Sequence, residues 1–259
     1  MRIEHILGMA SAAAPAIISL LAVSTPAAAG QTGRGPISCV IELYTSQGCS
    51  SCPPADALMQ SYSDREGVLA LSFNVDIWDN LGWKDTLASH KFTERQRQYA
   101  RMRGDGQVYT PQTVINGMAH AVGSDRAAID GEIKKTEAKI SAAHVVMQVK
   151  ADGGDIEVAV PTWSAAGTAP IDATLWLVKI TPSVPVAIAR GENAGQTITY
   201  HNVVRELTSV GHWMGEANST RLKHDAVADC KPGTCAVILQ QGGTGSVLGA
   251  AWVPGVGGT

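Results

Sequence analysis

The sequence predicts an α/β domain at residues 36–142, followed by an all-β, sandwich-like domain at residues 143–255. Two patterns lead to this division. In the first segment, apolar runs of strand length alternate with amphipathic stretches in the order β-α-β-α-β-β-α. In the second segment, short β-rich runs are separated by glycine-rich turns, and no amphipathic stretch is long enough for a regular helix.

Residues 1–29 have the features of a secretory signal peptide. Arg2 gives a positive start, an apolar run follows from Ala12 to Val23, and small residues precede a cleavage site after Ala29. The apolar run is shorter than the roughly 20 residues that span a membrane, although an uncleaved N-terminal anchor is the alternative. We therefore expect a periplasmic or secreted protein that meets the membrane only transiently, during export.

Charge and cysteine content narrow the function further. The formal net charge of −3 provides no basic surface of the kind that nucleic-acid binding requires. Outside the cytosol, disulfides form and persist. The five cysteines form two close pairs with one left over: Cys49 and Cys52, Cys230 and Cys235, and Cys39.

The first domain opens with a β-α-β unit. Residues 37–45 are apolar and β-rich, which predicts a buried strand. A helix is expected from Pro53 and Pro54 onward, because proline suits the first helical turn and apolar residues then recur at helical spacing. Residues 68–75 predict a second buried strand, and such a connection favours a parallel pair with a right-handed crossover.

The middle of this domain is predicted to be a loop and a helix. Residues 76–89 contain three acids and two tryptophans, Trp78 and Trp83, which either wall a groove beside Cys49 or pack the loop onto the core. Residues 91–103 form an amphipathic helix. Its inward residues are expected to be Phe92, Tyr99 and Met102. Its arginines are expected to face solvent: Arg95, Arg97, Arg101 and Arg103.

The domain ends with a hairpin and a helix. Asn116-Gly117 is a strong hairpin signal between short strands at residues 112–116 and 119–122. A last helix begins near Ser124, which suits an N-cap. A parallel unit, a helix, a hairpin and a closing helix make up the thioredoxin arrangement, so we expect a thioredoxin-like domain.

The second domain is inferred from strand-like runs alone. They lie at residues 145–149, 156–160, 173–178, 186–190, 197–208, 236–240 and 247–252. Short strands separated by turn residues are typical of a two-sheet sandwich.

Cys49-Ser50-Ser51-Cys52 joins the first strand to the first helix. The thiolate is the attacking species in disulfide exchange, and unpaired N–H groups at a helix N-terminus lower the pKa of a cysteine placed there. Cys49 is therefore the candidate attacking thiol. Cys52, about one helical turn further on, is the candidate resolving thiol. Half of a zinc site is the alternative interpretation of an isolated C-x-x-C motif.

Glu42 and Pro111 are further candidates for the same site. Glu42 lies among apolar residues on the first strand, so it must be paired, protonated or functional. Its functional interpretation is a proton acceptor for Cys52, and the alternative is a position at a partly wet sheet edge. Pro111 precedes the hairpin, where a cis-proline would face the dithiol and align a peptide. The alternative is an ordinary trans proline in a turn.

The other cysteines and the histidines allow several interpretations. Cys230 and Cys235 flank a Pro-Gly turn and suggest a structural disulfide, with a four-cysteine zinc site as the rival. Cys39 is expected to be a buried free thiol. A Cu(I) site that joins the dithiol to His90 or His120 is a further alternative to ordinary surface histidines.

Several stretches are similar to one family of secreted bacterial proteins. They are residues 42–56, from Glu42 through Cys-Ser-Ser-Cys to Asp56, and residues 74–85, 92–96, 108–112, 190–195 and 201–205. The chain thus resembles domain-of-unknown-function family 1223 over nearly its whole mature length. The resemblance implies export and a thioredoxin-like domain, but no particular reaction. The Ser-Ser spacer differs from the dipeptides of familiar thioredoxin-like oxidoreductases.

Together these observations favour an exported thiol–disulfide oxidoreductase that uses Cys49 and Cys52. Its partner would be a protein thiol or disulfide, with a possible redox partner protein, and it would need no cofactor. Two alternatives stay open. The same dithiol could serve a Cu(I)-binding or metal-carrier protein, or Cys49–Cys52 could be a static disulfide in a partner-binding scaffold.

Overall fold

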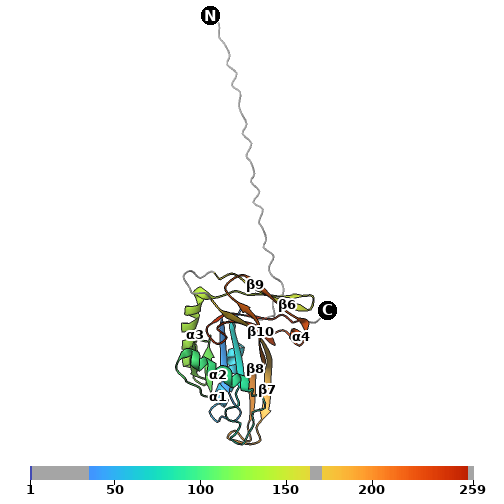
Figure 1. The fold of residues 1–259 in the computed structure, drawn as a ribbon. Helices are drawn as coiled ribbons and strands as arrows, with labels where there is room; N and C mark the ends of the chain where they lie inside the picture. Colours follow the sequence, from blue (N-terminus) through green and yellow to red (C-terminus); the bar gives the residue numbers. More distant parts are fainter. Residues whose placement is uncertain (2–34, 164–170, 256–259) are drawn as a thin grey trace.

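A computed structural model describes residue 1, residues 35–163 and residues 171–255. The predicted signal peptide therefore lies outside the described residues, apart from Met1. Figure 1 shows a large sheet with helices packed beside it and a smaller sheet across one end. No helix of the described part is long and apolar enough to span a bilayer.

The element order predicted for the first domain is confirmed. Its elements are β1 (Cys39–Thr45), α1 (Pro53–Ser63), β2 (Val68–Asn74), α2 (His90–Arg103), β3 (Gln112–Ile115), β4 (Ala119–Val122) and α3 (Arg126–Ile140). β1 and β2 are parallel, as expected for a β-α-β unit. β3 and β4 form the predicted hairpin, with positive φ at Asn116 and Gly117.

Four of the strands after residue 143 continue the same sheet, so the later elements do not form only a separate layer. These later elements are η1 (Ser141–Ala143), β5 (Gln148–Asp152), β6 (Asp155–Val160), β7 (Ala173–Ala187), β8 (Thr197–Trp213), β9 (Asn218–Leu222), α4 (His224–Val227), β10 (Cys235–Gln241) and β11 (Val247–Trp252). The eight-stranded sheet has the order β11-β10-β7-β8-β2-β1-β3-β4. The predicted boundary at residue 143 therefore does not separate two sheets.

β8 joins the two halves of the sheet. It pairs with β7 along its length but meets β2 in parallel at Ser72 and Val203 only. Side chains complete this contact: the Ser72 hydroxyl donates to the His201 carbonyl at 2.8 Å, and the Asn202 amide donates to the Ala70 carbonyl at 3.0 Å. Because β2 would otherwise present an open edge, this pairing satisfies backbone groups that water would have to satisfy.

The expected sandwich is present in part. β5, β6 and β9 form a three-stranded antiparallel sheet. Its buried residues Ile156 and Val158 pack with Leu175, Val237 and Leu239 of the large sheet in one apolar cluster. The two sheets thus enclose a core at the upper end of Figure 1, away from α1. Whether residues 143–255 fold independently stays a prediction.

Alternation along β1 sends its side chains to two different cores. Ile41 and Leu43 pack with α1 and α3, in a cluster that includes Met59. Val40 and Tyr44 pack on the opposite face, in a cluster that includes residues of α2. Successive strand residues point to opposite faces, so Glu42 lies on the α2 face.

The predicted outward position of Arg95 is wrong. Arg95 is buried and donates from Nε and Nη2 to the two carboxylate oxygens of Glu42, at 2.9 and 2.8 Å. The Tyr44 and Tyr99 hydroxyls also donate to Glu42, at 2.8 and 2.7 Å. Arg95 is on the inner face of α2 because it lies three residues after Phe92 and four before Tyr99. Met102, expected inside, is exposed instead.

Glu42 is therefore paired with Arg95, and the alternative prediction that Glu42 lies at a partly wet sheet edge is wrong. Burial opposes ionisation of Glu42, but the Arg95 guanidinium outweighs burial and holds the pKa of Glu42 below its ordinary value. Arg95 Nη2 also donates to Gln240 Oε1 on β10 at 2.8 Å. The ion pair thus connects β1, α2 and β10.

Replacing Arg95 with Met should destabilise the protein by about 3–5 kcal/mol, because Glu42 would become an uncompensated buried charge. Urea unfolding at pH 7 measures the effect. Arg97→Met is the matched control, since Arg97 is half-exposed on the outer face of α2 and should change stability by no more than about 0.5 kcal/mol. Equal effects of the two substitutions would contradict the role assigned to the pair.

Candidate functional site

The dithiol lies where β1 gives way to α1. β1 ends at Thr45, a turn follows, and Cys52 is the N-cap of α1, with Pro53 and Pro54 at the first helical positions. Cys49 and Cys52 form a disulfide. Cys49 is 4% exposed and Cys52 is fully buried, whereas the two serines between them are exposed. The predicted position of the motif between a strand and a helix is therefore confirmed. Little of the Cys49 side chain is accessible to solvent.

Pro111 lies close to the same end of α1. The Thr110–Pro111 peptide bond is cis. A Cβ added at Gly123 would lie 2.9 Å from Pro111 Cβ and 3.1 Å from Ala55 Cβ, so Pro111 and the first turn of α1 approach Gly123 together. The structure thus brings the Pro111 loop to the helix that begins at the dithiol.

The two tryptophans fasten the β2–α2 loop to the dithiol turn. Trp78 Nε1 donates to Thr110 Oγ1 at 2.8 Å, and a Cβ added at Gly48 would lie 3.0 Å from Trp78 Cβ. Trp83 Nε1 donates to Gln47 Oε1 at 2.8 Å. Trp78 therefore bridges the residue before Cys49 and the residue before Pro111.

Asp85, which is buried, forms a hydrogen bond with the turn that carries the dithiol. Its Oδ2 accepts from the Gln47 amide at 2.8 Å and from Asn74 Nδ2 at 3.0 Å. Burial raises the pKa of Asp85, although the hydrogen bonds from Asn74 and Gln47 oppose this shift.

A turn from the second half of the chain completes the site. Asn193 Nδ2 donates to the carbonyls of Gln47 and Cys49, both at 2.9 Å. Glu192 Oε2 accepts from the Ser50 amide at 3.2 Å. The sequence analysis missed both residues. The available signal was a polar turn between Gly191 and Gly195, but nothing local relates it to a dithiol more than 140 residues earlier.

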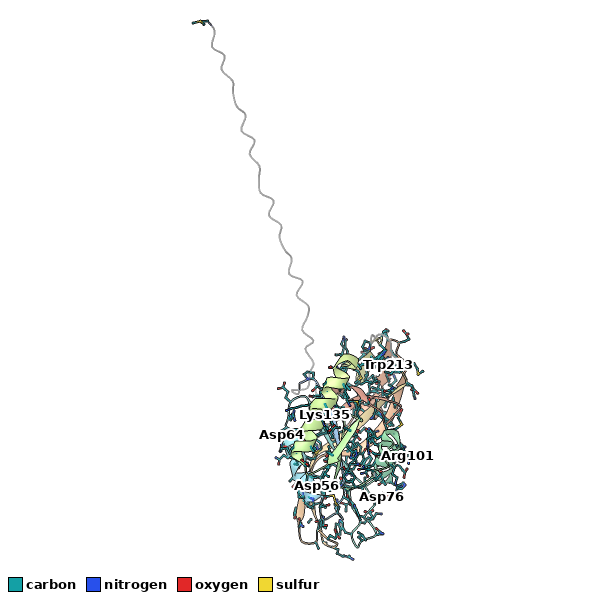
Figure 2. The ribbon with its side chains drawn as sticks, turned by 90° about the vertical axis from the view of Figure 1, so that its left-hand side faces the viewer. Asp56, Asp64, Asp76, Arg101, Lys135 and Trp213 are labelled. Atoms are coloured by element: carbon teal, nitrogen blue, oxygen red, sulfur yellow. A yellow bond between two sulfur atoms is a disulfide. The ribbon has the colours of Figure 1, made fainter. Side chains whose placement is uncertain are left out.

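Asp56 is a third site residue that was not predicted from the sequence. Its amide donates to the Cys52 carbonyl at 3.1 Å, so Cys52 and Asp56 are one helical turn apart. Asp56 is 1% exposed; Oδ1 accepts from Thr45 Oγ1 at 2.7 Å, and Oδ2 has no hydrogen-bond partner among the described residues. Burial raises the pKa of Asp56 to about 8. In Figure 2, Asp56 lies at the end of the molecule opposite Trp213.

The structure does not bring Glu42 to the dithiol side of the sheet. Glu42 packs on the α2 face with Tyr44, whereas Ile41 and Leu43 face α1. The side chain on the α1 face nearest the turn is Thr45, which donates to Asp56. The buried carboxyl on the Cys52 side is therefore Asp56.

The remaining candidates lie elsewhere. His90 pairs with Asp76 at 2.9 Å, and His120 lies 2.8 Å from the Tyr109 hydroxyl and 3.2 Å from Asp105. In the part of the chain that the structure describes, no group of three or more His, Cys, Asp or Glu residues could hold a metal ion.

The predicted pairing of the other cysteines is confirmed. Cys230 and Cys235 form their own disulfide, so the arrangement of four cysteines around one zinc ion is wrong. Cys39 is a buried free thiol, and burial raises its pKa to about 12. Cys39 is therefore unsuited to attack a disulfide at neutral pH.

Residues 40–240 match the family described as protein of unknown function (DUF1223). The chain belongs to this family. The crystal structure of protein AGR_C_4864 from Agrobacterium tumefaciens is 31% identical, with a TM-score of 0.73, over 87% of this chain and 98% of that one. HBP35 of Porphyromonas gingivalis is 11% identical, with a TM-score of 0.54 over 86% and 79%, and is alike in fold alone. No curated protein matches the chain significantly.

Asp56→Asn should change how stability depends on pH. Because the folded pKa of about 8 exceeds the ordinary aspartate value, folded wild type binds the extra proton between about pH 4 and pH 8 and loses stability as pH rises. Asp56→Asn lacks this loss of stability, because asparagine has no proton to release at this position. We expect the wild-type free energy of unfolding to fall relative to the variant by up to about 1.4 kcal/mol per pH unit in this window.

Urea unfolding of the oxidised proteins at pH 5 and pH 8 measures this difference. Asp64→Asn, which changes an exposed carboxyl just beyond the same helix, is the control and should track wild type. A pH-independent difference between wild type and Asp56→Asn would contradict the raised pKa.

Proposed function

We propose that the protein is an exported thiol–disulfide oxidoreductase whose active dithiol is Cys49 and Cys52, on a thioredoxin-like domain at residues 36–142. The observation that carries this proposal is the disulfide at the junction of β1 and α1, next to the Pro111 loop that Trp78 joins to the dithiol turn. The periplasm or the cell exterior is the proposed location, since disulfide chemistry is sustained there.

The exchange has two steps that balance in electrons and protons. In the reducing direction, the Cys49 thiolate attacks a disulfide of a substrate protein, forms a mixed disulfide and releases the first substrate thiolate. The Cys52 thiolate then attacks Cys49 Sγ, restores Cys49–Cys52 and releases the second substrate thiolate. Two electrons pass from the dithiol to the substrate, and the reverse sequence oxidises a substrate dithiol.

We assign proton transfer at Cys52 to Asp56 in place of Glu42. Side chains on a helix lean toward its N-terminus, so Asp56 lies over the turn that begins at Cys52. A pKa of about 8 is close to that of an ordinary thiol, which allows transfer in both directions. The protonated form of Asp56, which predominates below about pH 8, donates a proton when Cys52 leaves as a thiolate, and the carboxylate form accepts the Cys52 proton when Cys52 attacks.

The substrate is proposed to be an extended segment of a partner protein. The backbone around Thr110 and Pro111 lies beside the dithiol turn through Trp78, and an extended peptide laid there would run past Cys49. The second half of the chain contributes the turn that contains Glu192 and Asn193.

A static disulfide in a partner-binding scaffold is the second candidate. The observation that favours it is the low exposure of Cys49, 4%, because a buried sulfur is slow to exchange. Turnover distinguishes the two functions.

The reduced protein should reduce a disulfide-bonded peptide at least about tenfold faster than free dithiothreitol, since a helix N-terminus raises the thiolate fraction of Cys49. Cys52→Ala should stop at the mixed disulfide and accumulate it. Fluorescence of a quenched disulfide reporter follows the rate, and mass spectrometry identifies the trapped species.

The matched control is the double variant Cys230→Ser/Cys235→Ser, which removes the other disulfide and should retain the wild-type rate. Exchange no faster than free dithiothreitol, with no mixed disulfide in Cys52→Ala, would favour the static scaffold instead.

A further inference from the structure

The turn at residues 191–195, between β7 and β8, is built as a firm element against the dithiol. Within the turn, the Ala194 amide donates to the Gly191 carbonyl at 3.2 Å. At its base, the Gly195 amide donates to the Ile188 carbonyl at 2.8 Å. Asn193 is 1% exposed although it lies at the tip of a hairpin. A buried amide at such a position indicates that the tip is docked rather than free.

Trp83 packs against Gly191 of this turn. A Cβ added at Gly191 would lie 3.1 Å from Trp83 Cβ, and Gly191 has a φ of +83°, so only glycine fits there without strain. Trp83 also packs against the apolar cluster of Ile188, Ile198 and Tyr200. Figure 1 shows β7 and β8 reaching the same end of the molecule as the start of α1.

The contacts of the turn are those that a peptide backbone makes. Asn193 supplies N–H donors to the Gln47 and Cys49 carbonyls, and Glu192 supplies an oxygen acceptor to the Ser50 amide. The N–H and C=O groups of an extended peptide would satisfy the same three groups. The 191–195 turn thus occupies backbone hydrogen-bonding groups next to Cys49.

Glu192 also brings a charge to the amino end of α1. Its carboxylate lies 3.2 Å from the Ser50 nitrogen, which is four covalent bonds from Cys49 Sγ. The carboxylate is therefore within about 8 Å of that sulfur. The N–H groups at this end of the helix are the ones that stabilise a thiolate at Cys49.

The titratable groups around residues 46–52 include acids and bases. Asp56 on α1 and Asp85 on the β2–α2 loop are buried acids, and Lys84 and Arg190 are exposed bases next to Trp83 and Gly191 in the chain. Among the described residues, no Lys, Arg or His forms a hydrogen bond or ion pair with residues 46–52 or with Glu192, so Glu192 has no direct cationic partner.

We propose that the 191–195 turn is an internal competitor for an extended, disulfide-containing peptide substrate: Asn193 and Glu192 hold the backbone around Cys49, and a substrate segment that displaces them activates the thiol. This inference rests on the proposed function. Glu192 acts through the Ser50 amide and is a positioning residue. A neutral substrate carbonyl in its place would remove a negative charge beside Cys49.

Glu192→Gln tests the charge and keeps the hydrogen-bond acceptor. In the reduced protein, we expect this change to lower the Cys49 pKa by about half a unit to one unit, the size expected for a charge at this distance near a surface. The ultraviolet absorbance of the thiolate against pH, with Cys49→Ala subtracted, measures it. Glu216→Gln, at an exposed position beyond β8, is the control and should leave the Cys49 pKa unchanged.

Asn193→Ala tests the competition. It should lower KM for a disulfide-bonded peptide several-fold, because the backbone groups next to Cys49 become free. Unchanged Cys49 pKa in Glu192→Gln, or unchanged KM in Asn193→Ala, would overturn the proposal. The pKa measurement needs no exchange partner, so it remains decisive for Glu192 even if the protein proves to have no oxidoreductase activity.

Discussion

The buried pair of Glu42 and Arg95 fixes how the two halves of the chain meet. Arg95 spans from Glu42 on β1 to Gln240 and Gly243 at the end of β10, with distances of 2.8–3.2 Å. Two buried charges are tolerated only in an arrangement that satisfies them fully. With Glu42 committed to the α2 face, Ile41 and Leu43 must face α1, and the strand delivers the dithiol to the start of that helix.

Local sequence patterns were sufficient to predict the helices and strands of the first half and the pairing of the cysteines in both disulfides. Strand length, helical spacing and the Asn116-Gly117 turn each depend on neighbouring residues, so they are visible in the sequence. The pairing of β8 with β2 was not visible, because it depends on one backbone register and on Ser72 and Asn202, which look like ordinary polar residues. A domain boundary drawn where strand-like runs replace helical patterns therefore falls within a continuous sheet.

The same distinction explains the site. Cys49, Cys52 and Pro111 stand in a recognisable order, whereas the only sequence signal for Glu42 is that it is an acid among apolar residues. Strand alternation places Glu42 on the far face, and helical spacing places Asp56 one turn after Cys52. That spacing was present in the sequence. Asn193 was out of reach, since its role arises only when β7 and β8 extend to the dithiol.

The charges around the dithiol indicate which redox state the site favours. A helix N-terminus stabilises a thiolate, and a strongly stabilised thiolate makes a disulfide a good oxidant. Here Glu192 occupies the Ser50 amide, and Asp85 lies beneath the turn. Under the proposed function, the Glu192 carboxylate would oppose a thiolate at Cys49 and so stabilise the disulfide relative to the dithiol. The proposed exchange would then favour the reducing direction, and displacement of the 191–195 turn by a substrate would weaken that bias at the moment of exchange.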